Sequence, residues 1–253
     1  MKKKLNIAIL IVFAVQFSSC TKEIDYVAIS KKLNEGDLSK IMNANEDKYV
    51  HLSGMSFIIT ENNFGYKKTT KEDISGCLSI SDNIGYGRVE KSVNEKIKNS
   101  EKDSLVEKIN TEFIYRNEQY VCKNNEKLFS VFLFGKLQGL QNVKPAAYTY
   151  GLDQPPSLFY RLNQKEFENI INDDLKIKYD HFKYATILIG FHYLTGEEPS
   201  RISQIGIGID YEKKNDQKKY DKIHQYYSIY ISRKEDNESA KYDFVLDKKR
   251  FNE

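Results

Sequence analysis

Hydrophobic and polar positions in the middle and at the end of the chain follow the patterns of β-strands. Segments 126–134 and 182–190 carry aromatic and β-branched residues at both odd and even positions, which is typical of strands covered on both faces. Segments 226–233 and 241–247 alternate between apolar and polar residues, and a polar loop separates them. The sequence therefore predicts two central strands and a C-terminal hairpin with one face in water.

Apolar residues at helical spacing occur in three other segments. Asn163 and Glu166 have the spacing of an N-cap and its capping-box partner, and apolar residues then recur on one helical face as far as Leu175. Segments 27–43 and 91–110 show similar spacing. We therefore expect an α+β fold, with an antiparallel-rich β-sheet and helices packed on one side or at its ends.

The first twenty residues have the pattern of an export signal. Three lysines at positions 2–4 precede an apolar run at 5–17. This run has the length of the apolar region of a signal peptide and is shorter than the roughly 20 residues that cross a bilayer. The small residues Ser18 and Ser19 then precede Cys20. The pattern predicts a signal peptide that is removed from the mature protein.

This segment resembles the signal peptide and lipobox of bacterial lipoproteins, in which a leucine and two small residues precede the cysteine that becomes the lipidated N-terminus. Phe17 stands here in place of the leucine. The resemblance implies a diacylglycerol on Cys20, usually with an N-acyl chain such as palmitate, and two or more chains give stable anchoring. The alternative is an ordinary cysteine beside a plain cleavage site.

The expected organisation is a removed signal at 1–19, a lipidated cysteine and tether at 20–26, and a globular α+β domain at 27–253, with a soft subdivision near residue 150. Lys22 and the acidic residues after it resemble the surface-export tag of lipoproteins in the phylum Bacteroidota, although a flexible solvated tether explains them equally well. We expect a lipid-anchored protein of the cell envelope, on the outer membrane and, if the tag interpretation applies, on the cell surface.

Charge argues against a nucleic-acid partner. The full chain holds 39 Lys and Arg and 36 Asp and Glu residues, a formal net charge of +3. The predicted signal holds three lysines and no acidic residue, so its removal leaves a formal charge of zero. Nucleic-acid binding favours a basic patch or stripe. We therefore expect membrane contact through the lipid, and a protein, polymer or apolar small molecule as partner, but no nucleic acid.

Cys77 and Cys122 remain once Cys20 is assigned to the lipid. Oxidising conditions beyond the inner membrane would allow them to form a disulfide, but each also lies in a strand-like run, where a buried free thiol is equally ordinary. Both alternatives stay open. No CxxC spacing and no nearby histidine supports a metal site or a reactive cysteine. We therefore expect no metal and no cofactor.

Gly206 and Gly208 leave one face of a predicted strand without side chains, whereas Ile205, Ile207 and Ile209 fill the other face. A bare strand face admits close approach of a backbone, a ring or a ligand. Two interpretations follow. The glycines form the floor of an apolar ligand pocket, or they allow tight packing under a helix or a tyrosine.

The sequence lacks the familiar catalytic motifs. Its four histidines have no metal-binding spacing such as HExxH, and the chain has neither a GxSxG elbow nor a P-loop. Three classes of function remain: a noncatalytic binding protein on a lipid tether, a carrier of a lipid or other apolar ligand in a β-sheet cavity, and an envelope hydrolase with dispersed catalytic residues. We expect the first class, and hence a protein that is not an enzyme.

Overall fold

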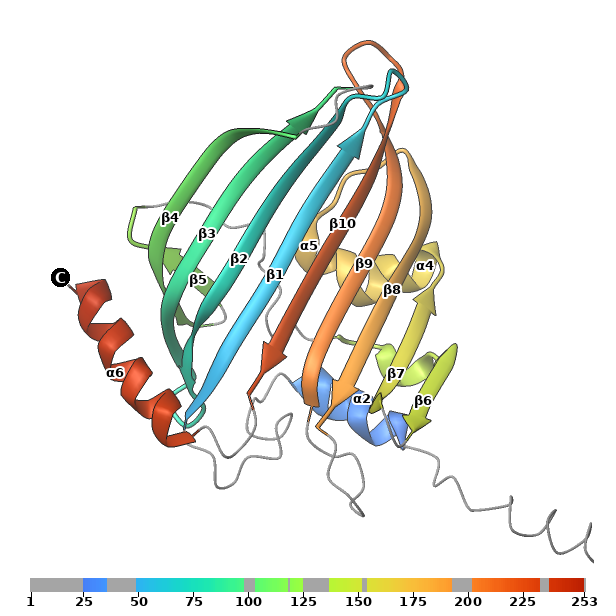
Figure 1. Cartoon of the computed structure of the whole chain (residues 1–253). Coiled ribbons are helices and arrows are strands. Elements are labelled where there is room, and N and C mark those ends of the chain that lie inside the picture. Colours follow the sequence, from blue (N-terminus) through green and yellow to red (C-terminus); the bar gives the residue numbers. More distant parts are fainter. Residues whose placement is uncertain are drawn as a thin grey trace, which may run out of the picture.

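The computed structural model describes residues 25–35, 49–97, 103–117, 119–124, 137–151, 154–192, 202–232 and 237–252. These residues form mostly one large antiparallel β-sheet, accompanied by few helices (Figure 1). The strands are β1 (Tyr49–Glu61), β2 (Lys67–Ser79), β3 (Ile84–Lys96), β4 (Ser104–Arg116), β5 (Gln119–Cys122), β6 (Ala147–Gly151), β7 (Gln154–Leu162), β8 (His181–Phe191), β9 (Ile202–Lys214) and β10 (Tyr220–Ile231). The helical segments are α2 (Tyr26–Glu35), a 3₁₀ turn (Leu140–Asn142), α4 (Gln164–Phe167), a π-helical turn (Glu168–Asn172), α5 (Asp173–Leu175) and α6 (Asn237–Asn252).

Two meanders meet in the middle of the sheet. The order of the ten described strands is β5-β4-β3-β2-β1-β10-β9-β8-β7-β6. Strands that are neighbours in the sequence therefore pair, except β5 and β6, which lie at the two edges of the sheet. β1 additionally pairs with β10. This central pairing sets Leu52 opposite Ile231 and Phe57 opposite Tyr226. It joins the two halves of the described chain in one layer.

The hydrophobic core lies on one face of the sheet. Alternate side chains of a strand point to opposite faces. The face that carries Leu78, Ile187 and Ile207, called the inner face from here on, belongs to the main buried cluster. Leu33 of α2 and Phe167 of α4 belong to the same cluster. Burial of these apolar side chains is the main stabilising contribution to the fold.

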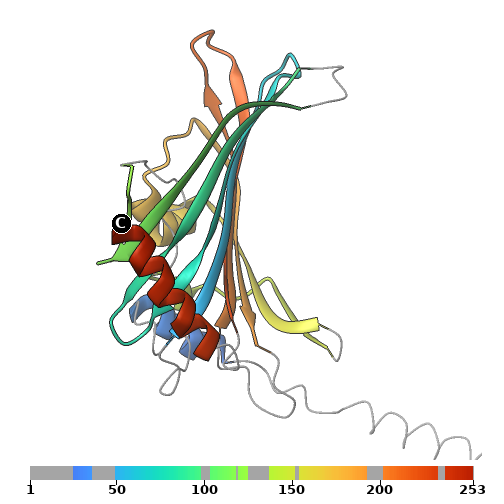
Figure 2. The same ribbon diagram turned by 60° about the vertical axis from the view of Figure 1, so that its left-hand side comes forward.

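The opposite face, called the outer face, contacts α6. Figure 2 shows α6 in front of the N-terminal strands, and its contacts run from β1 to β4. A smaller buried cluster joins Phe244 of α6 to Cys77, Tyr86 and Ile114. The ring centroid of Phe244 lies 5.2 Å from that of Tyr49 and 5.3 Å from that of Tyr86. One aromatic side chain therefore carries much of the apolar contact of α6.

The antiparallel-rich sheet and several predicted elements are confirmed. β8 covers the predicted strand at 182–190, and α2 covers the first part of the predicted helix at 27–43. The helix after Asn163 is present with its capping box: the Glu166 amide donates to Asn163 Oδ1 (3.0 Å), and the Asn163 amide donates to the Glu166 carboxylate (2.8 Å). The predicted strand at 126–134 lies outside the described residues.

The predicted helix at 91–110 is wrong, because this segment ends β3 and begins β4. Its apolar residues do not share a buried face. Val93 is buried, whereas Ile97 and Leu105 are 69% and 59% exposed. β3 pairs with β2 and sets Val93 opposite Thr70. This pairing outweighs the local helical spacing, because a helix here would have no apolar surface against which to bury its apolar residues.

The predicted C-terminal hairpin is also wrong. Its first strand lies in β10 but pairs with β1 and β9, and its second strand, 241–247, lies in α6. The alternation there was incidental, since Phe244 is buried while Tyr242 is 66% exposed. The whole of α6 contains an alanine, a leucine, an arginine and three lysines, which are residue types with good helix propensity. A helix that buries few side chains therefore suits the composition better than a strand.

Candidate functional site

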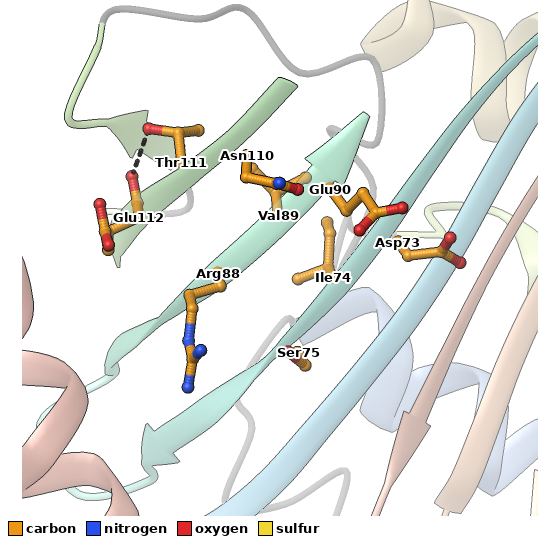
Figure 3. A pocket seen from close by; sticks show the side chains of 9 residues that line it. All are labelled: Asp73, Ile74, Ser75, Arg88, Val89, Glu90, Asn110, Thr111 and Glu112. Carbon is orange, nitrogen blue, oxygen red and sulfur yellow. Dashed lines mark hydrogen bonds between the residues drawn. The ribbon is translucent and has the colours of Figure 1, made fainter. Parts of the chain in front are cut away.

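An open groove of about 590 Å³ crosses the outer face of β2, β3 and β4 (Figure 3). Charged and polar side chains line it at alternate positions of the three strands: Asp73 and Ser75 on β2, Arg88 and Glu90 on β3, and Asn110 and Glu112 on β4. The residues between these positions complete the lining: Ile74, Val89 and Thr111. The period of two, which a strand imposes, is what brings six polar side chains to one surface.

Strand pairing arranges the polar side chains in two rows: Ser75–Arg88–Glu112 and Asp73–Glu90–Asn110. The directly opposed carboxylates of Asp73 and Glu90 repel each other. Two lysines offset this repulsion: Lys71 Nζ lies 2.6 Å from Asp73 Oδ2, and Lys108 Nζ lies 2.9 Å from Glu90 Oε1. With Glu112 and Arg88 included, the groove and its two lysines hold three acidic and three basic side chains.

A second cavity, of about 270 Å³, lies where α6 crosses β1 and β2, and Arg88 lines both this cavity and the groove. The register of β1 and β2 sets His51 directly opposite Cys77. Asp243 of α6 meets them, with its Oδ2 at 3.0 Å from His51 Nε2. One donor atom from each of these three residues lies within 4.8 Å of the others. We call His51, Cys77 and Asp243 the α6 junction.

The electrostatics of the α6 junction keep its thiol neutral when no cation is bound. Burial, followed by the charges of Asp247 and Asp243, raises the pKa of the Cys77 thiol to about 12. Burial also raises the pKa of Asp247, although Arg250 and Arg88 favour its charged form. Because the thiolate is the nucleophilic form, Cys77 alone is a poor nucleophile at neutral pH.

A third cavity, of about 430 Å³, lies on the outer face of β9 and β10. His224 Nδ1 lies 2.8 Å from Asp210 Oδ2. A hydrogen bond to the same carboxylate raises the pKa of Tyr184. The ring of Phe57 stacks on Tyr226 at 5.2 Å and lies 5.6 Å from the ring of His224. This surface therefore combines a histidine–carboxylate pair with two stacked rings.

Gly206 and Gly208 lie on the outer face of β9, and a tyrosine covers them. A Cβ atom at Gly206 would lie 3.3 Å from the Tyr226 hydroxyl, and one at Gly208 would lie 4.0 Å from Tyr226 Cδ2 and 2.8 Å from Thr186 Oγ1. The side chain of Tyr226 thus extends over both glycines. Of the two interpretations of these glycines, the structure describes packing under a tyrosine.

The two cysteines that the structure describes lie on opposite faces of the sheet. Cys20 lies outside the described residues, whereas Cys77 and Cys122 are buried and form no disulfide. Cys77 belongs to the outer-face cluster and Cys122 to the main core, so the sheet separates them and no disulfide joins them in this structure. Sequence reasoning assumed that Cys77 has no nearby histidine. That premise is wrong, because strand pairing brings His51 opposite it.

Sequence reasoning did not anticipate the groove or the α6 junction. The available signal was the spacing of polar residues, which recur two positions apart in three segments: Asp73 and Ser75, Arg88 and Glu90, and Asn110 and Glu112. Such spacing places both residues of a pair on the same face of a strand. Asn110 fell in a segment for which a helix was predicted, so the third strand of the groove was missed. Asp243 fell in the predicted hairpin, which left no helix to cross the strands that carry His51 and Cys77.

Comparisons with known proteins cover part of the chain. Residues 14–111 match the family described as Domain of unknown function (DUF3952), which is less than half of the chain. No curated protein matches the chain in sequence. None of the helices in the described ranges is long and apolar enough to cross a membrane.

Two solved structures show weak similarity. One is described as lipid–protein interactions in lipovitellin; it is 6% identical, with a TM-score of 0.41 over 73% of this chain and 25% of that chain. The other is a bifunctional dehydratase-cyclase domain in ambruticin biosynthesis; it is 6% identical, with a TM-score of 0.15 over 76% of this chain and 78% of that chain. The chain thus spans a quarter of the lipovitellin chain. Neither similarity carries an argument about fold or function.

Proposed function

We propose that the protein is a noncatalytic, lipid-anchored protein of the cell envelope that binds a protein partner through the groove on its outer face. The lipid on Cys20, a location on the outer membrane and presentation at the cell surface belong to this proposal. So does a layered arrangement in which the helices other than α6 pack on the inner face, while α6 lies beside the groove on the outer face and leaves the groove open to the partner.

The position of the first helix supports a close tether. α2 begins at Tyr26, six residues after Cys20, and its side chains Ile29 and Leu33 are buried in the core. An extended chain spans about 3.5 Å per residue, so the lipid attachment point and the start of the folded domain are separated by about 20 Å at most. An acylated Cys20 would therefore hold the domain close to the bilayer.

The observation that carries the binding proposal is the charge pattern of the groove. Three acidic and three basic side chains stand at fixed cross-strand positions. A partner with complementary charges can recognise such a pattern in one register. Covering the groove with a lipid would remove these charged side chains from water, which is costly even for paired charges. No aromatic ring lines the groove, so a sugar polymer would find no stacking surface there.

Site-specific photo-crosslinking in intact cells tests the binding proposal. A photoreactive amino acid replaces Asn110, which is exposed in the groove, and in a matched strain it replaces Asp216, which is exposed in the turn between β9 and β10. We expect a discrete protein adduct from position 110 and none of the same mass from position 216. The same adduct from both positions, or none from position 110, would contradict the proposal.

Fractionation tests the anchor separately. The Cys20→Ala variant should lose incorporation of labelled palmitate and move from the membrane fraction to the soluble fraction. Membrane association that persists without incorporated lipid would contradict the proposed lipid anchor. Neither result depends on the groove, because position 20 precedes the folded domain.

A further inference from the structure

The α6 junction collects a nitrogen, a sulfur and an oxygen donor from three separate elements. His51 on β1 and Cys77 on β2 are a directly opposed pair on the outer face. Asp243 approaches them from α6. The backbone of His51 is fixed on the other side of its strand, where its amide donates to Ser232 Oγ at 2.9 Å and its carbonyl accepts from the Ser232 amide at 3.0 Å.

The spacing of the donor atoms suits a small divalent cation. Zinc lies about 2.0 Å from histidine nitrogen and carboxylate oxygen and about 2.3 Å from thiolate sulfur. Tetrahedral geometry then separates the donors by roughly 3.3–3.5 Å. The 3.0 Å between His51 Nε2 and Asp243 Oδ2 is close to that separation. All mutual distances between the three donor atoms are within 4.8 Å, so binding zinc would bring the donors closer by at most about 1.5 Å.

Burial and the adjoining cavity distinguish this cluster from an exposed group of polar residues. Cys77 is only 2% exposed, yet it lines the cavity of about 270 Å³ together with His51 and Asp243. The cavity leaves room for a cation and for a water molecule on it. A divalent cation would also compensate the carboxylate charges that surround the buried thiol.

Asp247 lies one helical turn after Asp243 and lines the same cavity. Arg250 Nη1 donates to its Oδ1 at 3.0 Å, and Arg88 also favours its charged form. Asp247 is thus already paired with cationic groups. It acts as a neighbour of the site and not as a fourth ligand.

We propose that His51, Cys77 and Asp243 bind a zinc ion at the α6 junction, with the fourth coordination position open to water. Three protein ligands and one open position are the arrangement of zinc sites that also bind a small molecule. The ion would link α6 to β1 and β2, beside the end of the groove that Arg88 shares. This site is independent of the protein partner proposed above.

Metal binding can be measured with cobalt as a spectroscopic probe for zinc. The full chain carrying Cys20→Ser, purified in detergent and stripped with a chelator, is titrated with Co²⁺ alone. We expect one equivalent to bind, with the near-ultraviolet charge-transfer band of a cobalt–thiolate bond, and Zn²⁺ to displace it. Absence of a saturable band would overturn the proposal.

Two thiol variants identify the ligand. Cys77→Ser should abolish the charge-transfer band, whereas Cys122→Ser, which changes the other buried thiol, should keep it. Circular dichroism confirms that both variants are folded. A band that survives Cys77→Ser, or that disappears only in Cys122→Ser, would contradict the assignment.

A stability measurement covers the case in which Cys77→Ser does not fold. Zinc that binds only the folded protein raises its Tm. The Asp243 side chain is 47% exposed, so Asp243→Asn should fold normally. It should bind Zn²⁺ at least about tenfold more weakly and lose most of the zinc-dependent rise in Tm. An equal rise in Asp243→Asn and the parent chain would also overturn the proposal.

Discussion

Replacing Phe244 by alanine should release α6 from the sheet. Phe244 is 8% exposed and contacts the rings of Tyr49 and Tyr86. A buried phenylalanine removes about 150–250 Å² from water, which at about 25 cal/mol per Å² corresponds to roughly 4–6 kcal/mol. Residual burial in the undocked state lowers this value, so we expect a loss of about 3–4 kcal/mol in the free energy of docking.

Hydrogen exchange followed by mass spectrometry can localise this loss. A change of about 3 kcal/mol corresponds to roughly two orders of magnitude in an opening equilibrium. Amides of α6 should therefore exchange about a hundredfold faster in Phe244→Ala, while those of β8 and β9 keep their protection. Tyr242→Ala, which removes an exposed ring from the same helix, is the matched control. Equal protection of α6 in the two variants would refute the assignment of Phe244 as its main apolar contact.

Three further predictions concern the sheet and its caps. Gly76→Ala should destabilise severely, because its Cβ would lie 2.3 Å from a backbone oxygen of β3. Gly206→Ala should cost little, since its closest contact, at 3.3 Å, is the hydroxyl at the end of a tyrosine side chain. Urea denaturation compares the two variants, and equal midpoints would contradict this ranking. Burial raises the pKa of Tyr211 to about 12, from an ordinary value of 10.0, and raises that of Tyr227 further. The contribution of these two tyrosines to the free energy of unfolding is therefore complete below pH 10 and falls as the pH rises from 10 towards 12. In chemical denaturation over that pH range, the free energy of unfolding of Tyr211→Phe should fall less steeply than that of the parent chain. An unchanged slope would argue against the raised pKa of Tyr211. Asn163→Ala removes the N-cap and should cost about 1 kcal/mol, measured by thermal unfolding; an unchanged Tm would mean that the capping box contributes little.

Local signals in the sequence predicted the elements whose geometry is set locally. The capping box at Asn163 needs only a residue and its neighbour three positions later, and it formed as expected. The strand at 182–190 has apolar residues dense enough that any sheet would bury it. For the remaining strands, pairing with distant segments of the chain determined where each strand forms. Val93 was read at helical spacing because its partner Thr70 is far away in the sequence, and no local pattern reveals that register.

The candidate sites depended on the same long-range pairing. His51 and Cys77 are separated in the sequence but opposed in the sheet. Asp243 completes the α6 junction only because its segment is a helix that crosses β1 and β2. The groove likewise needs the register that places Arg88 between Ser75 and Glu112. Residue types could therefore suggest chemistry, but strand register determined which of them meet.

The most direct test of a groove-bound partner is the dependence of the Asn110 crosslink on the charge of the groove. Glu112→Lys reverses one charge in the row that contains Arg88, and Glu238→Lys makes the same change at an exposed position on α6, outside the groove. We predict that Glu112→Lys reduces the adduct at least tenfold while Glu238→Lys leaves it unchanged. An adduct of equal yield in both variants would contradict recognition through the groove.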